Sequence, residues 1–252
     1  MKKIGWRVWT LFVGAFLVTL IVTAPATLLA RVVEGSSSGR LVLANATGTM
    51  WRGSATPAIR QRTGGLLALE KLHWDIAILP LFGGKMSIEL RWDNVEQMQP
   101  MVVTASFTQT ELRNAALPLH AGFLGELLPL LQPVQLSGKM LIRSELFTIS
   151  RQGMSGSAVA DWIRAGSVLS SVNPLGSYRI NLAGAGERVD VSLLTTSGVL
   201  LLEGTGSFSS GRGLSFQGTA RASAESNGSI DELLNNFGPE SAPGVRSLNL
   251  MR

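Results

Sequence analysis

Few residues in this sequence have the type and spacing that catalysis or metal binding requires. His73 and His120 are the only 2 histidines in the 252-residue chain, so a serine–histidine–aspartate triad or a histidine-rich metal site has almost no candidates. Cysteine is absent, which excludes thiolate catalysis, disulfides and cysteine-ligated metals together. His73 falls on the polar face of an alternating segment, where we expect a solvated side chain.

The glycine and serine motifs do not complete a catalytic or phosphate-binding pattern either. Met154-Ser-Gly-Ser157 departs from the G-x-S-x-G motif, and no histidine follows it to activate Ser155. We interpret three glycine pairs without a further motif glycine or lysine as turns between strands: Gly184-Ala-Gly186, Gly204-Thr-Gly206 and Gly211-Arg-Gly213. The sequence therefore predicts no catalytic residue, no cofactor-binding residue, no metal ligand and no cofactor, and we do not expect an enzyme.

The composition indicates a folded protein with many turns. Hydrophobic residues make up 45% of the chain and charged residues 15%, unlike a disordered chain or a highly charged cytosolic protein. The 28 glycines fit many turns and closely spaced strands. Much of the net charge of +5 comes from Lys2, Lys3 and Arg7, and no basic stripe remains that could follow a phosphate backbone. We therefore expect no nucleic-acid partner.

The N-terminal segment predicts the compartment. The chain is uncharged from Val8 to Ala30, long enough for a helix to cross roughly 30 Å of hydrocarbon. We expect a transmembrane helix over 8–30, with residues 1–7 held in the cytoplasm by Lys2, Lys3 and Arg7. Residues 31–252 then lie across the membrane, as the exported part of a single-pass protein.

Two alternatives to the membrane helix stay open. Ala24-Pro25-Ala26 has the small residues that signal peptidase prefers, so the segment could be a cleaved signal peptide. A helix buried in the core is the other alternative, and the three adjacent positive charges disfavour it. Both the membrane helix and the signal peptide export the remainder of the chain.

Alternation of apolar and polar residues predicts a mainly β fold. Apolar residues occupy every second position in 71–78 and again in 85–93, and Leu79–Gly84 between these segments predicts a hairpin connection. The same alternation recurs around Val103, Leu136, Tyr178, Val189 and Leu214. Strands with one wet face favour an antiparallel sheet.

Two short helical segments interrupt the strands. Thr110 to Leu131 has apolar residues at roughly helical spacing and predicts one or two short helices, with possible halves 31–108 and 134–252 on either side. Ser229-Ile-Asp-Glu232 has capping-box spacing and predicts a second helix, which Gly238-Pro239 ends.

Trp51, Arg52 and Gly53 are the candidate interaction residues. Trp51-Arg-Gly-Ser-Ala55 is echoed by Met154-Ser-Gly-Ser-Ala158 and Phe216-Gln-Gly-Thr-Ala220, each with a large apolar residue, then glycine and alanine on one face of a strand. Glycine within a strand usually admits a close neighbour, so packing against another strand or helix is the first interpretation. A concave apolar surface for an acyl chain or another protein is the second, with Trp51 and Arg52 as interface anchors.

The order of these parts resembles the protein N family of the bacterial type II secretion system, the general secretion pathway. The resemblance covers nearly the whole chain and rests on the membrane helix ending at Arg31, on Gly48 to Ala55, on Asn173-Pro-Leu-Gly-Ser-Tyr-Arg179 and on the helix from Ile230 to Gly238. It implies a single-pass component of the cell inner membrane, with residues 31–252 as a periplasmic β-rich domain, in the apparatus that moves folded proteins across the outer membrane. The family also resembles AsmA-like proteins, whose curled antiparallel sheets present an apolar groove, so the resemblance implies a curled sheet here.

Two functions follow as hypotheses. The first is a non-enzymatic subunit that supports export and binds other inner-membrane or periplasmic subunits of the secretion system, by strand addition among other modes. The alternative is an AsmA-like periplasmic protein that binds or transfers membrane lipid on its one-sided apolar strands.

Overall fold

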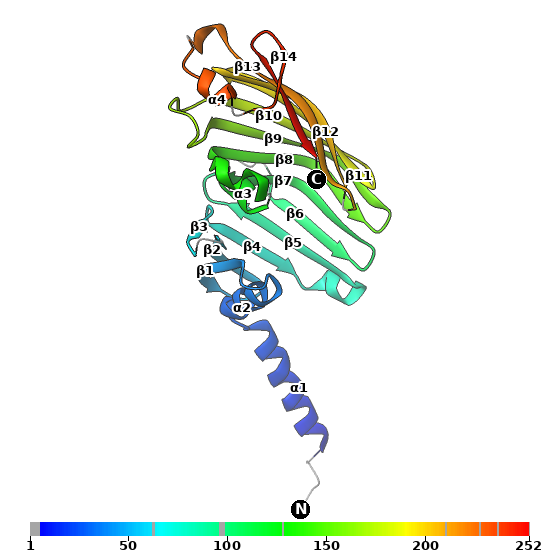
Figure 1. Ribbon diagram of the computed structural model, residues 1–252. Helices are drawn as coiled ribbons and strands as arrows, with labels where there is room; N and C mark the ends of the chain where they lie inside the picture. The colour runs from blue at the N-terminus through cyan, green and yellow to red at the C-terminus, as the bar shows by residue number, and fades with distance from the viewer. Residues whose placement is uncertain are drawn as a thin grey trace, which may run out of the picture. The chain divides into compact units, whose positions relative to one another are not determined.

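The computed structural model describes residues 6–61, 64–95, 99–127, 129–209, 211–226, 228–235 and 237–251. The chain forms two compact units, Met1–Asn94 (unit 1) and Val95–Arg252 (unit 2). Both units consist mainly of antiparallel strands with a few short helices, as Figure 1 shows. The expected mainly β, antiparallel fold class is confirmed.

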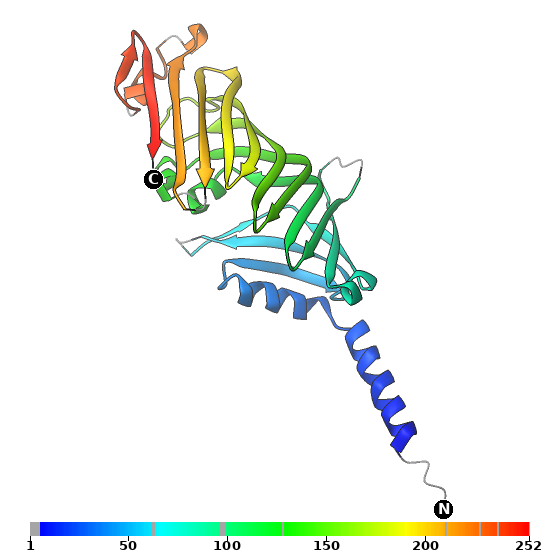
Figure 2. The same ribbon diagram turned by 90° about the vertical axis from the view of Figure 1, so that its right-hand side faces the viewer.

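Unit 1 combines two N-terminal helices with a small sheet. Its elements are α1 (Trp6–Val22), α2 (Ala26–Ser36), β1 (Leu41–Gly48), β2 (Arg52–Arg60), β3 (Leu66–Ala68), β4 (Leu72–Ala77), the 3-10 helix η1 (Leu79–Gly83) and β5 (Lys85–Trp92). The strands lie in the order β1-β2-β4-β5, and β3 pairs with the far end of β2. Figure 2 shows α2 alongside β1.

The hairpin predicted from residues 71–93 is confirmed. β4 and β5 pair in antiparallel fashion, and their alternation places Trp74 and Ile76 in the buried core at 5% and 7% exposure. Gly84 ends η1 in the left-handed conformation at φ 68°, which glycine adopts without strain.

The single helix expected over 8–30 is corrected to two helices. α1 ends at Val22, where the amide of Thr23 donates to the carbonyl of Thr19 at 2.9 Å, and α2 begins at Ala26. Pro25 lies between them in an extended conformation, and its ring disfavours a helical conformation at Ala24 before it. No helix among the described residues has both the length and the apolar character needed to span a membrane. Lys2 and Lys3 lie outside the described residues, as does the side chain of Arg7.

Unit 2 is a longer antiparallel sheet with short helices at its connections. Its elements are β6 (Met101–Ser106), β7 (Gln109–His120), α3 (Phe123–Leu127), η2 (Pro129–Val134), β8 (Ser137–Ser150), β9 (Gly153–Gly166), β10 (Gly176–Gly186), β11 (Arg188–Gly198), β12 (Leu200–Ser209), β13 (Gly213–Ala222), η3 (Ala224–Ser226), α4 (Asp231–Asn235), β14 (Glu240–Ala242) and β15 (Val245–Met251). From β6 to β13 each strand pairs with the next, and β15 and then β14 follow β13.

Strand register gives this sheet one apolar and one polar face. Met140, Trp162 and Tyr178 are direct neighbours across β8, β9 and β10 on the apolar face. Asn181, Ser192, Thr205 and Gln217 form the corresponding row on the polar face of β10 to β13. At one end of the apolar face, α4 contributes Leu233 and Leu234 to a buried cluster with Leu175, Leu200, Ala220 and Ile230.

The helical prediction is correct for one segment and wrong for most of the other. The helix expected from Ser229 onward is present as α4, which carries Asp231 in its first turn. Thr110 to His120, expected to be helical, belongs to strand β7, and only the end of the predicted segment is helical, as α3 and the start of η2. Whether the halves 31–108 and 134–252 fold separately stays a prediction.

The curl expected of the sheet is not found. Alternation of residue types determines which face of a strand is buried, whereas curvature depends on twist and bulges that the alternation does not encode. Among the described strands of unit 2, the row ends at β14, a strand of three exposed residues. β14 folds back on the start of β15, and the side chain of Glu240 accepts a hydrogen bond from the amide of Gly244 at 2.8 Å.

Candidate functional site

Trp51, Arg52 and Gly53 lie where the first two helices meet the sheet of unit 1. The indole N–H of Trp51 donates to the carbonyl of Ile21, in the last turn of α1, at 2.8 Å. The amide of Met50 donates to the carbonyl of Ala24 at 2.7 Å, and Pro25 forms a bridge with Thr49. The carbonyls at the end of a helix lack partners within it, so these bonds from residues 49–51 complete the end of α1. We call this region the helix joint.

A cluster of buried apolar side chains packs against the helix joint. Ala26, the first residue of α2, is 1% exposed and packs with Ala55, Trp74 and Ile76. The indole of Trp74 donates to the carbonyl of Met50 at 3.0 Å, which holds the segment before β2 in place. The start of α2 is therefore part of the core of unit 1.

Gly53 allows the close packing that the first interpretation of this motif predicts. A Cβ atom at this position would lie 2.6 Å from Cζ2 of Trp74 and 2.5 Å from the carbonyl oxygen of Thr47. In the two echoes of the motif, Gly156 and Gly218 also face the backbone of a neighbouring strand, that of Leu146 and of Glu203. All three motif alanines, Ala55, Ala158 and Ala220, are buried.

Arg52 lies on the opposite, polar face of the unit 1 sheet. Its guanidinium pairs with Asp75, with 2.8 Å between Nε and Oδ2, although the Arg52 side chain is 81% exposed. Beside this pair, Nε2 of His73 lies 2.7 Å from Oδ1 of Asp93. Arg52, Asp75 and His73 line an open concavity of about 620 Å³, together with Glu89. His73 is about half exposed, as the sequence predicts.

The structure brings serine, histidine and aspartate together where the sequence suggested no such group. Ser54 pairs with His73 across β2 and β4, and His73 contacts Asp93, so the three residue types of a hydrolase triad share one face. The hydroxyl of Ser54, however, is buried and shares its hydrogen bond with Thr47 at 3.0 Å. A nucleophilic serine must contact its histidine and reach the substrate, so this arrangement is a polar pairing within the sheet.

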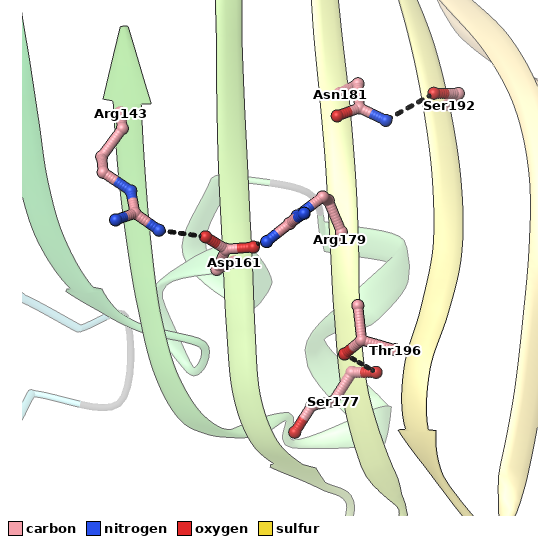
Figure 3. A network of polar contacts seen from close by, with 7 residues as sticks. All are labelled: Arg143, Asp161, Ser177, Arg179, Asn181, Ser192 and Thr196. Carbon is pink, nitrogen blue, oxygen red and sulfur yellow. Dashed lines mark hydrogen bonds and ion pairs between the residues drawn. The ribbon is translucent and has the colours of Figure 1, made fainter.

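Asp161 of unit 2 lies on the polar face of β9 and forms ion pairs with two arginines. Arg143 of β8 and Arg179 of β10 both bond its carboxylate, the latter with 2.8 Å between Nε and Oδ1, as Figure 3 shows. Burial alone would raise the pKa of Asp161, but the hydrogen bonds and positive charges of Arg179 and Arg143 lower the pKa below its ordinary value of 3.8. The two arginines, each about half exposed, leave one surplus positive charge in this cluster.

A second open concavity, of about 540 Å³, lies on the same face over β10 to β13. It is lined mostly by amide and hydroxyl side chains, among them Asn181 and Ser192, which bond each other at 3.2 Å (Figure 3). Arg188 and Asp190 add an ion pair at 3.1 Å. Such a lining can exchange hydrogen bonds with a polar ligand. Among the described residues, no group of three or more histidines and carboxylates could hold a metal ion.

Sequence reasoning missed Asp161 because its partners lie far from it in the chain. Arg143 and Arg179 each lie 18 positions away, and only the register of β8, β9 and β10 brings them to the carboxylate. The available signal was a lone acidic residue within a long alternating segment, which predicts a buried or paired charge but names no partner.

Comparison with known families gives one match. A family model described as "Type II secretion system (T2SS), protein N" matches residues 39–249. The match begins after α2 and runs almost to the end of β15. Neither a curated protein nor a solved structure matches the chain.

Proposed function

This chain belongs to the type II secretion system protein N family, and we propose on that basis that it is an inner-membrane subunit with its β-rich body in the periplasm. The family is a non-enzymatic component of secretion, so the expectation that the protein is not an enzyme is confirmed. The match over residues 39–249 is the observation that carries the proposal, because it includes most of the sheet residues of both units.

In this proposal the uncharged segment from Val8 to Ala30, most of which lies in α1, anchors the protein in the inner membrane. The side chains of α1 from Trp9 to Val22 are uncharged and mostly apolar on every side, with Trp9, Leu11 and Phe12 all about 70% exposed (69%, 74% and 71%). A helix that is apolar on every side favours a lipid environment over water. Lys2, Lys3 and Arg7 favour a cytoplasmic N-terminus, since positively charged flanks stay on that side.

The periplasmic body would support export by binding other inner-membrane or periplasmic subunits of the secretion system. The surplus positive charge of Arg143 and Arg179 and the polar concavity over β10 to β13 supply exposed groups for such contacts. Polar and charged groups across an interface determine which partner is accepted more than how tightly it binds.

Deletion of the gene tests the proposal. Secreted proteins should accumulate in the periplasm and fall in the culture medium, and a plasmid copy of the full gene should restore export. Cytoplasmic and periplasmic marker proteins serve as controls for lysis. Normal export, together with unchanged amounts of the other secretion subunits, would contradict the proposal.

The apolar face of unit 2 favours lipid binding as a second candidate function. Leu182, Leu193 and Leu202 are only half-buried on this face, and Phe208 is 42% exposed. A photo-crosslinking residue at position 193 should then capture lipid in living cells, whereas one at position 192, on the polar face of the same strand, should not. Equal labelling, or none at position 193, would remove this candidate.

A further inference from the structure

The turn between β4 and β5 exposes a concentrated group of apolar side chains. Leu79 is 83% exposed and Phe82 is 88% exposed, while Ile78 and Leu81 are each 39% exposed. No charged residue occurs from Ile78 to Gly84. Exposed apolar groups of this kind usually mark a surface that contacts a membrane or another protein.

The turn is held in a defined conformation even though its side chains face outward. Pro80 lies at the start of η1, the amide of Leu81 donates to the carbonyl of Ile78 at 3.1 Å, and the amide of Gly84 donates to the carbonyl of Leu81 at 3.0 Å. The backbone therefore presents Leu79 and Phe82 in a fixed way.

Strand register places η1 at the same end of unit 1 as the helix joint. Asp75 pairs with Arg52, and the amide of Ile76 donates to the carbonyl of Trp51 at 2.6 Å. Trp51 in turn bonds the last turn of α1 through Ile21. η1 begins three residues after Ile76, and both views show it on the α1 side of the unit 1 sheet (Figures 1 and 2).

We propose that η1 inserts Leu79 and Phe82 into the surface of the same bilayer that holds α1, as a second membrane contact of unit 1. This inference rests on the proposed anchoring function of α1. The exposed apolar side chains of α1, at the same end of unit 1, favour lipid as the occupant. A protein interface usually surrounds its apolar centre with polar residues, whereas an uncharged tip followed by the exposed Lys85 fits acyl chains below phosphate headgroups.

Single cysteines report the depth of each position without background, because the natural chain has none. The full chain carrying Phe82→Cys is labelled with an environment-sensitive fluorophore and reconstituted into phosphatidylethanolamine–phosphatidylglycerol vesicles. We expect a blue shift of its emission and loss of intensity when brominated lipids replace part of the bilayer. Leu66→Cys is the matched control, since Leu66 is 58% exposed and pairs with Arg60 at the opposite end of β2. It should show neither change.

Phe12→Cys in α1 separates failure of this inference from failure of the anchor. A label quenched at position 12 but not at position 82 overturns the inference and leaves the anchor intact. A label at position 12 that stays in water contradicts the anchor itself. Quenching at position 66 equal to that at position 82 also overturns the inference, because the contact would then not be specific to η1. The double variant Leu79→Ser/Phe82→Ser should keep its circular-dichroism spectrum and lose quenching at a label placed on position 81.

Discussion

Asp161 contributes to the electrostatic stability of unit 2 because it forms ion pairs with two arginines. Its side chain is 11% exposed, so the carboxylate has lost most of its hydration and depends on Arg143 and Arg179. The arginines stay about half exposed, so solvent screens their attraction and limits what the pairs contribute. Removing the shared carboxylate leaves both guanidinium groups on neighbouring strands without their common partner.

We expect Asp161→Asn to lower the free energy of unfolding by about 1–2 kcal/mol at neutral pH, because it removes two charge-assisted hydrogen bonds from a buried group. Chemical denaturation monitored by circular dichroism measures this change. Asp190→Asn is the control, since the Asp190 side chain is 46% exposed in its pair with Arg188. An equal loss in both variants would show that burial of Asp161 has no special effect.

The lowered pKa of Asp161 also predicts how stability depends on pH. The folded carboxyl holds its proton less tightly than the unfolded one, whose ordinary pKa is 3.8, so its contribution is fully present above that value. The contribution is lost as the pH falls through the lower folded pKa. The difference in unfolding free energy between the natural chain and Asp161→Asn should therefore shrink in acid. A difference that stays constant with pH would contradict this.

Gly53 was a candidate interaction residue, and the packing around it predicts a structural effect. Gly53→Ala should lower the free energy of unfolding by about 1–3 kcal/mol, because the new methyl group meets the ring of Trp74 and the backbone of Thr47. Gly211→Ala, where nothing lies within 4 Å of the added Cβ, should change it by less than ~0.5 kcal/mol. Equal stability of the two variants would show that the sheet accommodates the methyl group.

At the scale of elements, the strands could be predicted from sequence because a strand with one wet face alternates at every second residue. The segments 71–78 and 85–93 follow this pattern without interruption, and β4 and β5 occupy nearly the same bounds. The end of α4 was predictable for a similar local reason, because Gly238-Pro239 cannot continue a helix.

Over Thr110–His120 the helical prediction was wrong because β7 reverses its alternation. Leu112 and Leu119 are seven positions apart, a spacing that a regular strand would divide between its two faces and that a helix would place on one. Pairing with Phe147 and Met140 nevertheless puts both leucines on the apolar face, and Asn114 between them has a positive φ of 49°. A local change of backbone thus imitates helical spacing, and only pairing with β8 distinguishes the two.

The helix joint predicts that α1 and the sheet of unit 1 open together. Trp51→Phe keeps an aromatic ring but removes the N–H that bonds the carbonyl of Ile21, which should lower the stability of this contact by about 1 kcal/mol. The amide of Met50, which bonds Ala24, should then exchange with deuterium roughly fivefold faster. Trp9→Phe, at a position that is 69% exposed in α1, should leave the rate unchanged. An unchanged rate in Trp51→Phe would show that Met50 is protected independently of Trp51.

At the scale of the whole molecule, reporters test the predicted topology. Alkaline phosphatase fused after Arg252 should be active, because that enzyme folds only after export, and β-galactosidase at the same position should be inactive. Exchange of Lys2, Lys3 and Arg7 for glutamate should reduce phosphatase activity, since positive flanking charge holds the N-terminus in the cytoplasm. Active β-galactosidase on the natural chain would contradict a periplasmic body.

The family could be predicted from the order of parts, whereas the arrangement of charges could not. The N-terminal apolar segment, the Trp51 motif and the last helix occur in an order that suggested the family, and the match over 39–249 confirms it. The polar faces depend on distant pairing, as with Arg52 and Asp75 or with His73 and Asp93, and a sequence does not reveal such neighbours without the register.

The short hairpin of β14 and β15 affects how neighbouring copies of the protein can contact one another. Proteins confined to one membrane surface meet more often than proteins in free solution. An unpaired edge strand of a sheet can then pair with the edge strand of a second molecule. Here the side chain of Glu240 accepts a hydrogen bond from the turn that follows β14. The three exposed residues of β14 already lie beside the start of β15. At this edge of the sheet, neighbouring copies should therefore not pair into a continuous intermolecular sheet.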